Sequence, residues 1–342
     1  MGTKAKRMAD KNSKVDGNKT KMTTGKKVII ALIIILSITA ILLGTFIGII
    51  LKKVELIEFS HIDETQIDIN ENLYSEVSEN VTKDEFENIK NVALFGVDGG
   101  RSDAIIIASI NQNDNSIKLL SIPRDTYVTV EGYGKTKINH AYAYGKEQLA
   151  LKTINSNFGL NISEYVTVNF KGLINVINKI GGIQLEISKE EKEYINQYAH
   201  ESYALTGKST KLLTSYGNVT LTGEQALTHS RNRTIGSDFK REERQRDVIT
   251  AAMEKVSKKS LKDLWNLSDS ILKEVKTNLN ITECMGIVAE VLPNAKSYLS
   301  NVISKQVPST EIGKGETIDG LYYFVCDLAE ASQVFKDTIY GE

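Results

Sequence analysis

Arginines are concentrated in one short stretch of this 342-residue chain, residues 230–246 (SRNRTIGSDFKREERQR). Arg231 and Arg233 are two residues apart, and the next predicted helix carries Arg241, Arg244, Gln245 and Arg246. Because a guanidinium group binds phosphate oxygens with two parallel hydrogen bonds, several of them together could hold a pyrophosphate. The spacing leaves a second interpretation open, a solvated charged helix on which Glu242 and Glu243 pair with the arginines.

Further charged side chains stand where apolar runs meet loops in residues 98–125 (DGGRSDAIIIASINQNDNSIKLLSIPRD). Residues 92–97, 104–110 and 117–122 are short apolar runs bounded by turn-forming sequence, which is typical of buried strands. Loops at the ends of strands commonly carry the chemistry that a rigid sheet supports. The candidate side chains at these strand ends are Asp98, Arg101, Asp103, Arg124 and Asp125.

The rest of the chain alternates between predicted strands and predicted helices. Apolar periodicity predicts further strands over 126–130, 165–170, 183–187 and 321–325. It predicts helices over 147–158, 171–180, 222–229, 239–258, 260–275, 282–292 and 327–339. Residues 189–220 are polar and are interpreted as an excursion from the fold. This alternation predicts an α/β fold, with a central mixed sheet flanked by helices.

Local signals position individual side chains on the predicted helices. Arg241 and Gln245 are four residues apart and therefore share a helix face with Val248. Asn139 and Asp238 are candidate helix caps. The helix over 171–180 is nearly all apolar, which fits either ordinary core packing or the border of a lipid pocket.

The N-terminal part of the chain has a different composition. Residues 1–27 contain nine Lys or Arg against two Asp, which predicts a disordered cytoplasmic tail. Residues 28–51 carry no charge, which predicts a single transmembrane helix. Because the basic excess precedes this span, the remainder of the chain is expected outside the cell. Residues 52–90 are interpreted as a stalk or lead-in, and residues 91–342 as an extracellular domain with its core over 91–258.

The sequence gives little support to other kinds of catalytic site. Cys284 and Cys326 have no metal-binding spacing, and they could form a disulfide or remain two separate buried thiols. His140 and His229 stand alone, so there is no pattern typical of a zinc site. No serine has a histidine at a spacing typical of a catalytic triad.

Five separated motifs resemble the LytR–CpsA–Psr family of bacterial cell-wall enzymes. They are GVDGGRSDAIIIASI (96–110), LLSIPRDTYVTVEGYGKTKINHAYAYG (119–145), YVTVNFKGLINVINKIGGI (165–183), LTGEQALTHSRNR (221–233) and DFKREERQRDVI (238–249). The resemblance implies a membrane-anchored extracellular transferase. Its substrate would be a glycopolymer phosphate on a polyprenyl-pyrophosphate carrier, its acceptor peptidoglycan, and its cofactor Mg²⁺ or Mn²⁺. Teichoic acid, capsule and secondary wall polysaccharide are all open as the polymer.

The resemblance also implies roles for individual side chains. Asp98 and Asp103 correspond to the acids associated with the metal. The side chains expected around the pyrophosphate are Arg101, Arg124, Arg231, Arg233, Arg241 and Gln245. The candidate catalytic residues are Asp98, Asp103, Arg124 and Arg231. Only two glycines separate Asp98 from Arg101 here, whereas many members of the family carry a longer insertion.

Two other functions stay open at this point. The same residues would serve a hydrolase that cleaves the lipid pyrophosphate with water. A non-enzymatic membrane-bound regulator could instead use the arginines to bind nucleic acid, since a basic cluster attracts phosphates. The predicted outward orientation argues against nucleic acid as a partner. We therefore expect a lipid-linked glycopolymer, peptidoglycan and membrane lipid as partners.

Overall fold

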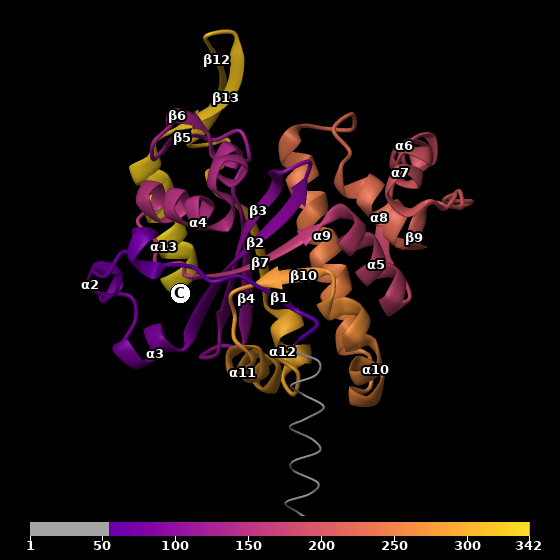
Figure 1. The fold of residues 1–342 in the computed structure, drawn as a ribbon, viewed down its shortest axis with the longest axis horizontal. Helices are drawn as coiled ribbons and strands as arrows, with labels where there is room; N and C mark the ends of the chain where they lie inside the picture. Colours follow the sequence, from indigo (N-terminus) through magenta and orange to yellow (C-terminus); the bar gives the residue numbers. More distant parts are fainter. Residues whose placement is uncertain (1–54, 342) are drawn as a thin grey trace, which may run out of the picture. The chain divides into compact units, whose positions relative to one another are not determined.

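A central sheet of seven strands runs through the computed structural model, which describes residues 55–341 (Figure 1). The strand order is β1-β10-β7-β2-β3-β4-β11. The bounds in that order are Glu58–Phe59, Val275–Thr277, Glu164–Asn169, Ile89–Asp98, Arg101–Asn111, Ser116–Ser121 and Val302–Gln306. Strand β2 pairs antiparallel with β3 but parallel with β7, so the sheet is mixed as predicted.

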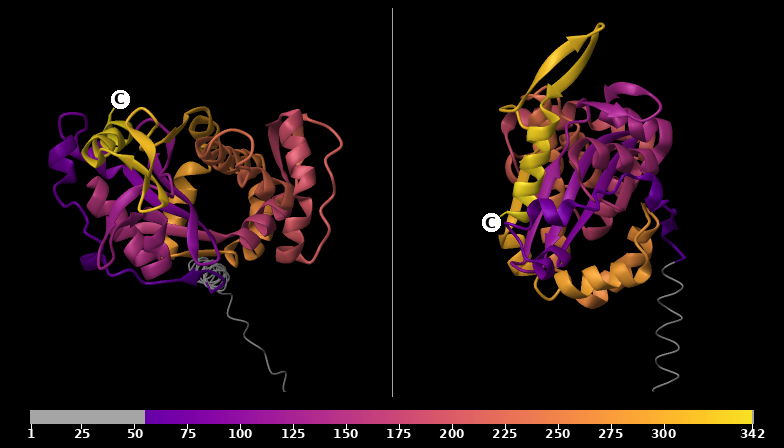
Figure 2. Two further views of the ribbon diagram at one scale, coloured as in Figure 1. Left: turned by 90° about the horizontal axis from the view of Figure 1, so that it is seen from above. Right: turned by 90° about the vertical axis from the view of Figure 1, so that its left-hand side faces the viewer.

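Among the described residues, three two-stranded antiparallel sheets lie outside this sheet. They pair β5 (Tyr127–Val130) with β6 (Gly134–Lys137), β8 (Ile183–Ile187) with β9 (Gly217–Leu221), and β12 (Gly313–Ile318) with β13 (Leu321–Cys326). The predicted strands over 126–130, 183–187 and 321–325 are therefore real, but they do not belong to the central sheet. Figure 2 shows the β12–β13 hairpin projecting from the rest of the domain.

Helices cover both faces of the sheet (Figures 1 and 2). One face is covered by α4 (Ile138–Phe158) and α13 (Leu328–Tyr340). On the other face lie α5 (Phe170–Ile180), α9 (Asp238–Ser257) and α12 (Ala295–Ser300), and α8 (Gly223–Ser230) packs on α5 and α9. The remaining helices are α2 (Leu73–Val77), α3 (Lys83–Glu87), α6 (Lys189–Gln197), α7 (Tyr203–Thr206), α10 (Leu261–Leu272) and α11 (Ile281–Val291), with short 3₁₀ helices η1 (Glu64–Gln66) and η2 (Ala199–Ser202).

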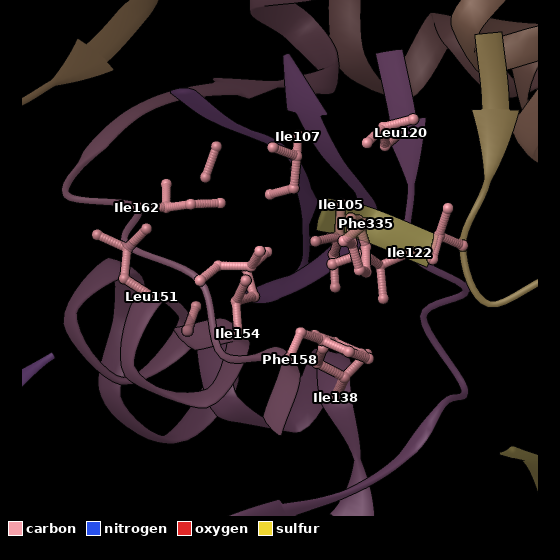
Figure 3. Close-up of a cluster of buried hydrophobic side chains, with 14 of the residues drawn as sticks. Ile105, Ile107, Leu120, Ile122, Ile138, Leu151, Ile154, Phe158, Ile162 and Phe335 are labelled. Atoms are coloured by element: carbon pink, nitrogen blue, oxygen red, sulfur yellow. The ribbon is translucent and has the colours of Figure 1, made fainter. Parts of the chain in front are cut away.

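Strand alternation divides the apolar residues of β3 between the two faces of the sheet. Ile105 and Ile107 pack in the cluster under α4 and α13 (Figure 3), whereas Ile106 and Ala108 pack in a separate cluster on the opposite face. The first cluster also buries Ile62, Ile67, Leu73 and Val77. The segment interpreted as a stalk or lead-in is therefore, from residue 55 onward, in part packed on the domain, because its apolar side chains help to fill the core.

Three local expectations are corrected by the structure. The polar excursion over 189–220 contains α6, whose Ser188 and Glu191 form a capping box, and the first residues of β9. Asn139 is not a cap, because α4 begins at Ile138 and only breaks later, at Gly145 and Lys146. The N-cap position of α9 is taken by Ser237, one residue before the predicted Asp238.

The predicted basic tail over 1–27 and transmembrane helix over 28–51 lie outside the described residues. Between residues 55 and 341, no helix has both the length and the apolar character that a bilayer crossing requires. Cys284 lies on α11 and Cys326 on β13, and both thiols are free.

Candidate active site

A cavity of about 480 Å³ is bounded by the sheet and by α5 and α9. Its charged lining comes from Asp103, Glu201, Arg231, Arg233 and Arg241, and its polar lining includes Asn169, Tyr194, Ser230 and Gln245. The rest is mainly apolar and includes Leu94, Ile106, Val166, Val168, Leu173, Val176, Val248, Ile249, Ile271 and Val275. This volume lies in the range of small-molecule sites, and an apolar wall with a few convergent charges is typical of such sites. The cavity suits a ligand with an anionic group and a hydrocarbon chain.

Asp103 reaches the cavity because β3 is irregular at this point. Gly96 pairs with Ala104 and Val97 pairs with Ser102, so Asp103 is an extra residue without a cross-strand partner. A Cβ atom on Gly96 would lie 3.0 Å from the Cβ of Ala104, so glycine permits this close approach. Arg101 and Asp103 therefore belong to a strand and not to a loop, because Gly99 and Gly100, both with positive φ, complete the turn before them.

Arg124 lies directly beside Asp103. Its Nη1 atom donates to Asp103 Oδ1, and its Nε lies 3.7 Å from Asp125 Oδ2. Asp125 in turn forms an ion pair with Lys137, whose Nζ lies 2.7 Å from Asp125 Oδ1. Arg124 also lines a small hollow together with Arg241. The segment that follows β4 and helix α9 therefore bring two arginines, distant in sequence, into one hollow, and Arg241 lines the cavity as well.

Arg231 and Arg233 approach the cavity from the segment between α8 and α9. The guanidinium of Arg231 lies over the ring of Phe170, 4.9 Å from its centroid, and 3.6 Å from Glu201 Oε2. Arg233 lines the same cavity and is exposed. The face of the Phe170 ring attracts the Arg231 guanidinium, whose planar fork suits a two-pronged contact with phosphate.

Helix α9 is not a solvated charged helix. Arg241, Arg244 and Arg246 are only 2%, 7% and 6% exposed. Arg246 donates to Ser121 Oγ at 2.7 Å and to Ser304 Oγ at 2.6 Å, which ties α9 to β4 and β11. As predicted from their spacing, Arg241, Gln245 and Val248 share one face, and that face lines the cavity.

Arg244 points away from the cavity and holds the segment that carries Arg231 and Arg233. Its Nε donates to Glu191 Oε1 at 2.7 Å. Its two terminal nitrogens donate to the backbone carbonyls of Asn232, at 3.3 Å, and Ile235, at 2.8 Å. One buried guanidinium thus fixes the backbone on both sides of Arg233, and Glu191 from the polar excursion balances its charge.

His229 lies beside the ion pair of Arg244 and Glu191 but does not compete with Arg244 for the Glu191 carboxylate. Its Nδ1 is 4.0 Å from Glu191 Oε1. Burial lowers the pKa of His229 to about 4, against the opposing effect of Glu191 and with a further lowering by Arg244. At neutral pH the imidazole is therefore neutral, and Arg244 is the charged partner of Glu191.

Replacing Arg244 by alanine is expected to lower the free energy of unfolding by about 3 kcal/mol, because it leaves Glu191 and two carbonyls without their donor. Denaturant unfolding of the unmodified protein and of the Arg244→Ala variant measures this loss. Lys240→Ala on the same helix is the control, because its bond to Glu243 is exposed and should contribute less than about 1 kcal/mol. Equal effects of the two variants would show that Arg244 does not hold the segment.

Two of the predicted residues lie away from this cavity. Asp98 lines a separate open hollow with Gly99, Gly100, Asn169 and Phe170. Arg101 is exposed at the start of β3 and does not line the cavity. The structure therefore brings together Asp103, Arg231, Arg233, Arg241 and Gln245, with Arg124 adjoining them, and leaves Asp98 and Arg101 outside.

The described residues contain no group of three or more His, Cys, Asp or Glu side chains that could hold a metal. A magnesium ion, however, needs only one or two carboxylates when a ligand supplies phosphate oxygens. Asp103 offers one such carboxylate at the charged end of the cavity, with arginines beside it. The donor set thus fits a hard cation that binds together with a phosphate ligand, and Asp98 is at best a second donor from the neighbouring hollow.

Sequence reasoning missed several residues of the cavity. Phe170, Tyr194 and Glu201 line it, and the last two come from the segment interpreted as an excursion. On the apolar helix α5, Leu173 and Val176 line the cavity, while Ile174, Ile177 and Ile180 pack in hydrophobic clusters. Helix α5 therefore contributes to the core and to the wall of the cavity, and its helical spacing was the available signal. That this cavity takes a lipid stays a prediction.

Comparisons with known proteins agree on one family. The model of the LytR_cpsA_psr family matches residues 56–339. The polyisoprenyl-teichoic acid–peptidoglycan teichoic acid transferase TagU of Bacillus anthracis is 34% identical over 264 residues, which cover 75% of this chain and 79% of that protein.

Two solved structures share the fold. One, described as TagT bound to LIIa-WTA, has a TM-score of 0.61 and 28% identity, covering 76% of this chain and 92% of that one. The other, the LytR-CPS2A-psr family protein YwtF (TagT) with bound octaprenyl pyrophosphate lipid, has a TM-score of 0.57 and 26% identity over the same shares of the two chains.

Proposed function

This chain belongs to the LytR–CpsA–Psr family, and we propose that it transfers a glycopolymer phosphate from a polyprenyl-pyrophosphate carrier to peptidoglycan. Its relatives are named as teichoic acid transferases, so a teichoic acid is the first polymer to test. The observation that carries the proposal is the cavity itself. One part presents arginines with the carboxylates of Asp103 and Glu201, and most of the remainder is a wall of apolar side chains.

The two parts of the cavity match the two parts of such a lipid. A prenyl chain gains free energy when aliphatic side chains remove it from water, at roughly 25 cal/mol for each Å² buried. The pyrophosphate carries several negative charges, which Arg124, Arg231, Arg233 and Arg241 can contact from several sides. A relative with 26% identity holds octaprenyl pyrophosphate, which is a ligand of this type.

In the proposed reaction, a hydroxyl oxygen of the acceptor forms a bond to the phosphorus that carries the glycopolymer. The bond between this phosphorus and the bridging oxygen breaks, and polyprenyl phosphate leaves. The hydroxyl proton ends on a phosphate oxygen of the products. Negative charge increases on the leaving phosphate, so fixed guanidinium groups stabilise the transition state more than the bound substrate.

We propose Mg²⁺ as the cofactor, with Asp103 as its carboxylate ligand and Asp98 as a candidate second donor. When bound, the ion would supply positive charge that offsets the charge on the pyrophosphate oxygens. Arg124 holds the Asp103 carboxylate in place and adjoins Arg241. The side chains thereby order the donor group before the substrate arrives, which limits the reorganisation required during the reaction.

The direct test uses the full-length protein with a labelled polyprenyl-pyrophosphate glycan, Mg²⁺ and peptidoglycan. We expect label to appear in the peptidoglycan and polyprenyl phosphate to be released in equal amounts. Release of lipid phosphate without label in peptidoglycan would instead establish the hydrolase. Absence of both products, while the protein still binds octaprenyl pyrophosphate, would favour a non-catalytic role.

We also propose that residues 28–51 anchor the protein in the cell membrane, with the domain outside the cell. The full-length protein should stay in the membrane fraction after a high-salt wash, because hydrophobic insertion is insensitive to ionic strength whereas electrostatic attachment is screened. External protease should cleave near residue 240 in intact protoplasts. Release by salt alone would contradict the anchor, and protection from protease would contradict the orientation.

A further inference from the structure

Two tyrosine rings form an exposed stacked pair on the part of the domain that carries β5, β6 and α4. The ring centroids of Tyr133 and Tyr144 are 4.1 Å apart, and the planes are inclined by 18°. The two residues remain 55% and 45% exposed. Large aromatic side chains left at the surface as a contiguous group commonly mark a binding site.

The backbone at both tyrosines has an unusual conformation. Tyr133 stands between Gly132 and Gly134, which both have positive φ, in the turn of the β5–β6 hairpin. Tyr144 directly precedes the break in α4, where Lys146 has φ 53° and ψ −146°. A residue other than glycine seldom adopts this conformation, and such strain is concentrated at functional sites. The break ends the first part of α4 at the point where the Tyr144 ring meets Tyr133.

An open hollow adjoins the stacked pair. Besides the two tyrosines it is lined by Gln66, Glu131, Gly132, Gly145, Gln148, Leu149 and Lys152. The lining thus combines aromatic rings with amide, carboxylate and ammonium groups. Sugar rings present both kinds of surface, because their C–H faces are apolar and their hydroxyl groups donate and accept hydrogen bonds. Tyrosine suits such a ligand, because it has an apolar face and a polar tip.

The pair is connected to the charged end of the cavity. The His140 ring lies 5.7 Å from that of Tyr144. The preceding residue, Asn139, donates its backbone N–H to the carbonyl of Arg124 at 3.2 Å. Burial, followed by the charges of Arg101 and Lys137, lowers the pKa of His140, which is consistent with these cations lying near the imidazole. A ligand on the tyrosines would therefore extend past His140 toward Arg124.

We propose that Tyr133, Tyr144 and the adjoining hollow bind the acceptor, a glycan strand of peptidoglycan, and present one of its hydroxyl groups to the pyrophosphate site. This rests on the proposed transferase function and adds the location of its second substrate. The arginines account for the pyrophosphate and the aliphatic wall of the cavity for the prenyl chain, which leaves the acceptor without an assigned site. The exposed tyrosine pair supplies an aromatic surface for a sugar chain, and His140 and Asn139 connect it to Arg124.

The test measures transfer to soluble glycan strands released from peptidoglycan, using the full-length protein and a fixed concentration of lipid-linked donor. Tyr133→Ala and Tyr144→Ala should each raise the KM for the strands roughly tenfold, since one stacked ring contributes about that factor. Tyr144→Phe keeps the ring and should change this KM less than about threefold. The affinity for octaprenyl pyrophosphate should be unchanged in all three variants.

Tyr216→Ala is the matched control. Tyr216 is 61% exposed but lines neither the hollow nor the cavity, so its loss should not change the KM for the strands. An unchanged KM for the strands in both alanine variants, with normal melting temperatures, would overturn the proposal. A higher KM for the lipid-linked donor alone would also overturn it, because the rings would then contact the donor glycan.

Direct binding separates this inference from the proposed function. Isothermal titration of the same strands requires no turnover, and binding should weaken roughly tenfold in Tyr144→Ala but not in Tyr216→Ala. If the protein transfers no glycan but shows this difference, the transferase function fails while the glycan site stands. If transfer occurs and no binding difference is found, the glycan site fails alone.

Discussion

Replacing Arg231 by lysine is expected to reduce glycopolymer transfer by roughly 100-fold, a loss typical of removing one fixed donor from a transition-state site. Lysine keeps the charge but loses the planar fork that stacks on Phe170. The melting temperature should change little, because Arg231 is 40% exposed at its side chain and its pair with Glu201 is also exposed. Transfer and thermal unfolding, measured on the same preparations, check both parts.

Glu201→Gln is the control for this variant. It removes the carboxylate near Arg231 but leaves the guanidinium and the Phe170 ring in place. If Arg231 acts on the pyrophosphate, transfer by Glu201→Gln should stay within about threefold of the unmodified protein, since exposed ion pairs contribute little. Equal losses in the two variants would indicate that the ion pair, and not the contact with substrate, is what matters.

Arg124 and Arg231 should also act together on the substrate. Arg124→Ala and Arg231→Ala should each weaken binding of octaprenyl pyrophosphate, and the double variant should lose less or more than the sum of the two free energies. Residues that share one ligand show such non-additive effects, whereas independent sites do not. Small additive changes, with transfer intact, would place the pyrophosphate elsewhere.

Asp103→Asn is expected to lower the turnover number by roughly 100-fold. Among the described residues, Asp103 is the only one whose carboxylate both lines the cavity and contacts Arg124, and the substitution removes it. Binding of octaprenyl pyrophosphate without metal should be equal or tighter, because the charge of Arg124 is then free to meet the phosphates. Transfer should also stop in excess chelator and return when Mg²⁺ is restored. Initial rates over a series of Mg²⁺ concentrations, for the unmodified protein and for Asp103→Asn, would measure the change in the Mg²⁺ concentration that gives half-maximal transfer.

Asp98→Asn is the matched comparison, since it makes the same change in the neighbouring hollow. A smaller loss than in Asp103→Asn is expected. Full transfer in excess chelator would remove the metal from the mechanism. A fall in melting temperature that parallels the loss of transfer in Asp103→Asn would show that this carboxylate has a structural role.

Local patterns determined the secondary structure and much of the chemistry. The apolar runs over 92–97, 104–110 and 117–122 are the middle strands of the sheet, because alternation and turn residues act between near neighbours in sequence. The four-residue spacing of Arg241 and Gln245 placed both on the face that lines the cavity, because a helix repeats every 3.6 residues. Residue types alone indicated an anion site.

Only the tertiary structure decided which of these residues meet. Arg124 and Arg241 lie more than a hundred residues apart in sequence, and no local signal predicts that they line the same hollow. Asp103 enters the cavity because a one-residue bulge in β3 changes the side of the sheet to which its side chain points, whereas Asp98, at the end of β2, lines a neighbouring hollow. Glu191 came from a segment that looked like a polar excursion, since burial of a charge depends on partners brought by distant elements. Sequence therefore determined the chemical groups and their local geometry, and long-range packing determined which of them form one site.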